Sequence, residues 1–115
     1  MKEFESELKY KDKTYRLPFN MNVMQAIQSE YGSLDEWGKL SDGKGGEPNI
    51  KAIIFGYTEM FNEGIDMDNF ENGTNEPYLT AKQVGRIITD VGLNAAVKLL
   101  NDTVEESVKN EEKNV

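Results

Sequence analysis

The segment NIKAIIFGYTEMFNE, residues 49–63, has the strongest helical periodicity in the chain and decides the fold that we expect. Its apolar residues recur at the i, i+3, i+4 and i+7 spacing that places them on one face of a helix. That stripe consists of Ile50, Ile53, Ile54, Tyr57, Met60 and Phe61. Gly56 costs a helix about 1 kcal/mol relative to alanine, so we expect it to allow close packing by a neighbour. We therefore predict a helix over residues 49–63 that ends at Asn62-Glu63-Gly64.

Capping residues on both sides of this segment predict four further helices. Three pairs have the spacing of a capping box: Asn22 with Gln25, Ser33 with Glu36, and Thr80 with Gln83. Asn20 is the alternative start of the first of these helices. Gly32 and Gly92 follow apolar runs and are suited to end helices, because glycine adopts the left-handed backbone of a helix C-terminus. The predicted spans are 21–31, 33–40, 81–91 and 94–108.

Residues 3–19 have the alternating pattern of a β-hairpin with one buried face. Phe4, Leu8 and Tyr10 alternate with charged residues, and the same alternation returns after the polar turn Lys11-Asp12-Lys13. Pro18 has no amide hydrogen, so we expect it at a strand end or edge. The segments 41–48 and 65–79 are rich in glycine and polar residues and are predicted to be loops.

These elements predict one mainly helical α+β domain over residues 1–108, in which the hairpin packs on four or five helices. The length of 115 residues agrees with a single domain. Four of the seven residues in 109–115 are charged, so we expect this segment to be a flexible tail.

Composition excludes several classes of function. The chain has no cysteine and no histidine, which excludes disulfides, thiol nucleophiles and metal sites that depend on either residue. The acidic segment that begins at Asp66 fails the EF-hand pattern, since Glu71 replaces the required glycine and Pro77 the last ligand. We therefore expect no catalytic residue, no metal and no cofactor.

The charge argues for a protein partner. The net charge is −8, whereas a nucleic-acid-binding protein needs a basic surface, so we expect no nucleic-acid partner. No apolar run reaches the length of a membrane span, so we expect no membrane contact and a cytoplasmic location. Between Lys51 and Lys82 the chain has no basic residue and several carboxylates. This acidic stretch is either a solvated surface or a patch for a basic partner.

Methionine and aromatic residues near the predicted helix ends are the candidate partner-binding residues. Methionine adapts to irregular gaps in a core and also to varied partners. The set therefore has two interpretations, core filling or a plastic interface. Its members are Met24, Tyr57, Met60, Phe61, Met67 and Phe70.

The order of these elements resembles the tail assembly chaperones of long-tailed bacteriophages and prophages of Gram-positive bacteria. The resemblance spans about residues 5–108 and rests on structural motifs. The hairpin LKYKDKTYRLPF (8–19) leads to a helix that ends in IQSEYGSLDEW (27–37). The apolar helix NIKAIIFGYTEMFNEG (49–64) is then followed by YLTAKQVGRIITDVGL (78–93), which enters its helix through Leu-Thr.

The resemblance implies a non-enzymatic morphogenesis factor. Such chaperones coat the tape measure protein, help to recruit tail tube subunits around it and are absent from the mature virion. A small subunit that coats a filament-like partner is also expected to form a homo-oligomer. Two alternatives stay open: a virion subunit such as a tail tube, terminator or connector protein, and an acidic inhibitor that mimics DNA.

Overall fold

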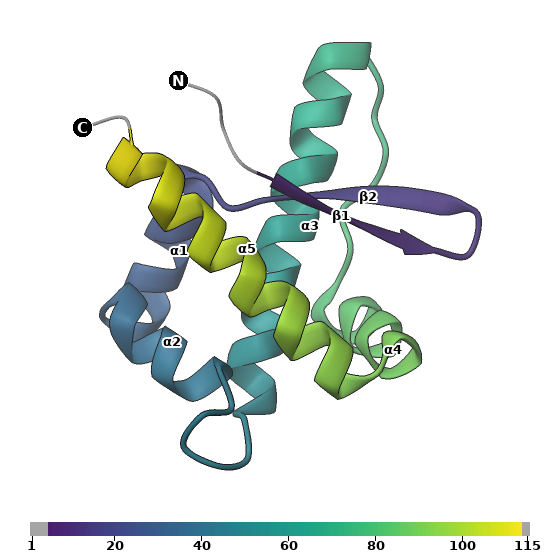
Figure 1. Cartoon of the computed structure of the whole chain (residues 1–115). Helices are drawn as coiled ribbons and strands as arrows, with labels where there is room; N and C mark the ends of the chain where they lie inside the picture. The colour runs from purple at the N-terminus through teal and green to yellow at the C-terminus, as the bar shows by residue number, and fades with distance from the viewer. Residues whose placement is uncertain (1–4, 114–115) are drawn as a thin grey trace.

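The fold is α+β and mainly helical, as the sequence predicts. The computed structural model describes residues 5–113, with side chains through residue 107. An antiparallel hairpin precedes five helices (Figure 1). The elements are β1 (Glu5–Tyr10), β2 (Lys13–Pro18), α1 (Met21–Tyr31), α2 (Leu34–Ser41), α3 (Ile50–Asn72), α4 (Ala81–Val91) and α5 (Leu93–Lys113).

Helix α3 is the central element, and β2, α1, α2 and α4 all pack against it. Figure 1 shows α5 crossing α3, and the Tyr57 hydroxyl of α3 donates a hydrogen bond to the Ala96 carbonyl of α5 at 2.5 Å. The apolar stripe predicted for 49–63 supplies much of the core. Ile53, Tyr57, Met60 and Phe61 have no exposed surface.

The predicted close approach at Gly56 is confirmed. The indole of Trp37 on α2 lies directly against this glycine, and a Cβ at residue 56 would stand 2.5 Å from Trp37 Cζ2. The Trp37 Nε1–H donates to the Ala52 carbonyl one turn earlier, at 2.9 Å. Because Gly56 has no side chain, Trp37 of α2, the single tryptophan of the chain, can pack in the core.

The predicted end of the central helix is wrong, and the loop predicted for 65–79 is irregular only over residues 73–79. Helix α3 continues through Gly64 and ends at Asn72, where Gly73 takes the left-handed φ of 65°. Gly64 stays helical because its missing side chain makes room for β2: a Cβ there would stand 2.5 Å from the Arg16 carbonyl oxygen. Only residues 73–80 connect α3 to α4 as irregular chain.

The hairpin lies across α3 and is attached at both ends to other helices. Leu17 of β2 is completely buried, and Pro18 is the last residue of its strand, as predicted. The Ser6 and Thr103 hydroxyls share a hydrogen bond of 2.6 Å between β1 and α5. The Tyr10 hydroxyl donates to Asp90 of α4 at 2.6 Å. Residues 3 and 4 of the predicted hairpin lie outside the described residues.

Two of the predicted helix starts are confirmed. The Ser33 and Thr80 hydroxyls each accept from the backbone N–H three residues later, and Gln83 completes the second capping box. Of the two candidate starts of α1, Asn20 is the cap and Asn22 is not: the Asn20 side chain accepts from the Val23 N–H. Helix α5 begins at Leu93, directly after Gly92, and runs past the predicted end at residue 108.

Candidate functional site

The six predicted partner-binding residues divide by exposure. Tyr57, Met60 and Phe61 have no exposed surface and belong to the core. Met24 and Met67 are half-buried. Phe70 is 90% exposed, the most exposed large apolar side chain in the described part of the chain. Burial of a phenylalanine is strongly favourable, so its position in water singles out the end of α3.

This end of α3 and the chain that returns from it form an arm, which we define as residues 62–79; its irregular part, residues 73–79, is the return segment. Figure 1 shows the last turns of α3 projecting past the hairpin, with the chain descending beside them toward α4. Two asparagine amides on α3 hold the return segment. Asn62 accepts from the Leu79 N–H at 2.8 Å and donates to the Leu79 carbonyl at 2.9 Å. Asn69 makes the same pair of bonds to the Glu76 backbone, at 2.9 and 3.0 Å.

Arg16 of β2 ties the arm to the hairpin. Its guanidinium makes a fork with the Glu5 carboxylate at 3.0 and 3.1 Å. Its Nη1 also donates to Asp68 and to Glu71, each at 2.9 Å. These three acceptors raise the pKa of Arg16 above its ordinary value, so the side chain stays charged. One cation meets three carboxylates here, and the arm keeps an excess of negative charge.

An acidic hollow of about 260 Å³ opens between the start of α1, the middle of α3 and the return segment. Glu63 is held there by Asn20 and Asn22, whose side-chain amides both donate to its Oε2, at 2.7 and 3.0 Å. Asp66 accepts from the Tyr78 hydroxyl at 2.7 Å. The hollow is lined by Asn22, Val23, Glu59, Asn62, Glu63, Asp66 and Tyr78, none of which is positively charged.

Glu59 is the unusual group in this hollow. It is half-buried, and burial followed by the nearby charge of Glu63 raises its pKa above the ordinary glutamate value. Among the described residues, Glu59 makes no hydrogen bond and no ion pair. A carboxylate in this position lacks the cation or donor that would offset its desolvation.

Two exposed aromatic side chains accompany the acidic hollow: Tyr78 lines it, and Phe70 lies one helical turn beyond Asp66. Phe70 follows Asp66 by one helical turn, so the two residues lie on the same face of α3. Tyr78 is 57% exposed and lies across from Asp66, to which its hydroxyl donates. The surface therefore combines an unpaired negative charge with exposed aromatic area.

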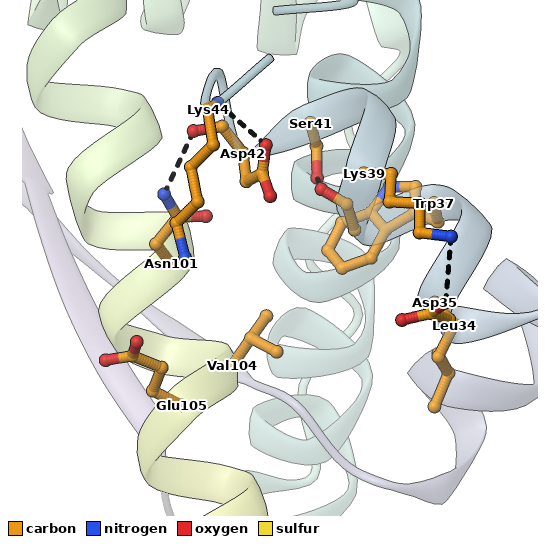
Figure 2. Close-up of a pocket in the computed structure, with 11 residues that line it drawn as sticks. Leu34, Asp35, Trp37, Lys39, Ser41, Asp42, Lys44, Asn101, Val104 and Glu105 are labelled. Atoms are coloured by element: carbon orange, nitrogen blue, oxygen red, sulfur yellow. Dashed lines mark hydrogen bonds and ion pairs between the residues drawn. The ribbon is translucent and has the colours of Figure 1, made fainter.

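A second hollow, of about 340 Å³, lies between α2 and α5. Figure 2 shows Leu34 on one wall and Val104 on the other, with the loop after α2 at one end. Its polar groups bind each other: Asn101 donates to the Asp42 carbonyl at 3.3 Å, and Lys39 pairs with Asp35 at 3.3 Å. Its lining carries charges of both signs, so this hollow does not favour a partner of one charge over the other.

Two further features of the described residues bear on the class of site. No set of three or more Asp, Glu, His or Cys side chains is placed to hold a metal ion within residues 5–107. Within the same range, no helix combines the length and apolarity that crossing a membrane requires.

The sequence pointed to the acidic stretch but not to the hollow. Glu59, Glu63, Asp66 and Phe70 fall at helical spacing, which would have placed them on one face had α3 been extended past Gly64. The contributions of Asn20, Asn22 and Tyr78 come from other elements and leave no signal in the spacing. Comparison of the chain with protein-family models, with curated proteins and with solved structures found no match.

Proposed function

We propose that this protein is a non-enzymatic tail assembly chaperone that binds the tape measure protein of a long-tailed phage or prophage and recruits tail tube subunits to it. The proposal joins the resemblance in the sequence to one surface of the structure. It places the protein in the host cytoplasm during assembly and outside the mature virion.

The observation that carries the proposal is the exposure of Phe70, which is 90% exposed in the last turn of α3. An exposed aromatic residue on a rigid element is typical of a protein-binding surface, where such residues supply much of the binding energy. The asparagine bonds to the return segment hold the arm in one conformation, which lowers the entropy lost on binding. The net charge of −8 supports the role of a solubilising partner for an aggregation-prone protein.

Co-expression with the tape measure protein from the same gene neighbourhood tests this proposal. We expect the tape measure protein to move from the pellet to the supernatant and to co-elute with the chaperone in size-exclusion chromatography. A tape measure protein that pellets equally with and without this chain, while the chain elutes alone, would contradict the proposal. Recovery of the chain in purified phage particles would favour a virion subunit instead.

A further inference from the structure

We infer that the acidic hollow and Phe70 together form the docking surface for a helical protein segment in which a lysine or arginine is followed, about three helical turns later, by an apolar residue. The cation enters the hollow beside Glu59, and the apolar residue packs on Phe70 and Tyr78. The inference rests on the proposed function for the identity of the partner, the tape measure protein.

The shape of the surface defines two adjacent subsites. The hollow is bounded by α1, α3 and the return segment, so a side chain can enter it from outside. Phe70 stands one turn of α3 beyond Asp66, at the outer margin. Glu59 lies eleven residues before Phe70 on α3, about 16 Å along the helix axis, so a partner helix that presents a long cationic side chain and an apolar one at i and i+11 matches that separation.

The charges select a cation for the inner subsite. Glu63 and Asp66 already accept hydrogen bonds from neutral donors, namely the two asparagines and Tyr78. Glu59 has no such donor in the described residues, although it is half-buried beside Glu63. An ammonium or guanidinium group would supply charge-assisted hydrogen bonds to this carboxylate and offset the repulsion between the two glutamates.

The second hollow, between α2 and α5, differs from the acidic hollow in its charges. It is larger than the acidic hollow, but its lining carries both signs of charge, and Lys39 is already paired with Asp35. Ile50, at the opposite end of α3, is 45% exposed and does not line the acidic hollow. Ile50 therefore serves as the matched apolar control for Phe70, and the exposed Glu47 as the matched charge control for Glu59.

The test measures binding by isothermal titration calorimetry with two ligands, using the full chain. One is the purified tape measure protein, and the other is a synthetic amphipathic helical peptide of leucine and lysine. We expect Glu59→Gln and Phe70→Ser each to weaken binding about tenfold, as loss of a charged hydrogen bond or a buried aromatic contact predicts. Glu47→Gln and Ile50→Ser should stay within about twofold of the unmodified chain. Circular dichroism establishes that each variant is folded.

The two ligands separate failure of this inference from failure of the proposed function. If the tape measure protein does not bind the unmodified chain, the proposed function fails. The docking surface is then tested by the peptide titrations alone. If either ligand binds but Glu59→Gln and Glu47→Gln weaken binding equally, only net charge matters and the inference is overturned. Equal losses for Phe70→Ser and Ile50→Ser, or binding of neither ligand, also overturn it.

Discussion

The indole of Trp37 packs so closely on Gly56 that the smallest possible side chain at residue 56 would meet it. A Cβ there would stand 2.5 Å from Trp37 Cζ2 and 3.2 Å from Cε2. The ring is held in place by its bond to the Ala52 carbonyl and is 2% exposed. One glycine in the central helix thus sets how near α2 can lie to α3.

Gly56→Ala is therefore predicted to destabilise the protein, although alanine favours a helix by about 1 kcal/mol. The clash with a fixed aromatic ring should outweigh that gain and leave a net loss of about 2 kcal/mol. Urea unfolding followed by the fluorescence of Trp37 measures this loss. Gly38→Ala in α2 is the control, because a Cβ there meets nothing within 4 Å, and it should stabilise by up to about 1 kcal/mol. Equal effects of the two substitutions would contradict the packing described.

Gly64→Ala tests why α3 continues into the arm. A Cβ at residue 64 would stand 2.5 Å from the Arg16 carbonyl oxygen, which is backbone and cannot rotate away. We expect a loss of about 3 kcal/mol in the free energy of unfolding. Gly85→Ala, whose Cβ would make an ordinary 3.6 Å contact with Ile54, should be neutral or stabilising. A stable Gly64→Ala variant with an unchanged hairpin in its NMR spectrum would show that β2 does not need this glycine.

Asn62→Ala is predicted to loosen the return segment. The substitution removes both side-chain bonds to the Leu79 backbone and costs about 2 kcal/mol. Hydrogen exchange should be faster at the Leu79 amide. Asn62→Asp keeps the acceptor for that amide and should preserve its protection better. Unchanged exchange at Leu79 in Asn62→Ala would mean that the asparagine does not hold the arm.

Glu59 gives the protein a specific dependence on pH. Its pKa is raised in the folded state by burial and by Glu63, so the folded chain binds the Glu59 proton more tightly than the unfolded chain does. The charged form therefore lowers stability once the pH exceeds the raised pKa, and this cost vanishes below the ordinary glutamate pKa of about 4.3. Glu59→Gln should raise the melting temperature at pH 7 but not at about pH 3. A Glu59→Gln variant that is less stable than the unmodified chain at pH 7 would contradict this account.

Local chemistry made part of this fold predictable. The Ser33 and Thr80 caps depend on hydroxyls and backbone groups three residues apart, so the sequence places them without tertiary information. The stripe from Ile53 to Phe61 is likewise set by helical periodicity alone. Gly56 also followed from the sequence, because an unfavourable residue inside a strong helix needs a packing reason.

The errors arose where distant elements decide the outcome. Gly64 has the appearance of a helix stop, and only the passage of β2 against it explains why the helix continues. The sequence left Asn20 and Asn22 as alternative caps of α1, and it did not show that both amides meet Glu63, which lies on an element far along the chain. The exposure of Phe70 could not be read from the sequence either, because spacing does not state where a helix leaves the core.

The most direct measurement of the central claim is the composition of complexes captured through a tagged copy of this chain in cells that produce the phage. Mass spectrometry of the capture before lysis, beside that of purified virions, tests both parts of the claim. The account predicts that the tape measure protein co-purifies with the chain before lysis and that the virions lack the chain. A capture without the tape measure protein, or virions that contain the chain as a regular component, would contradict it.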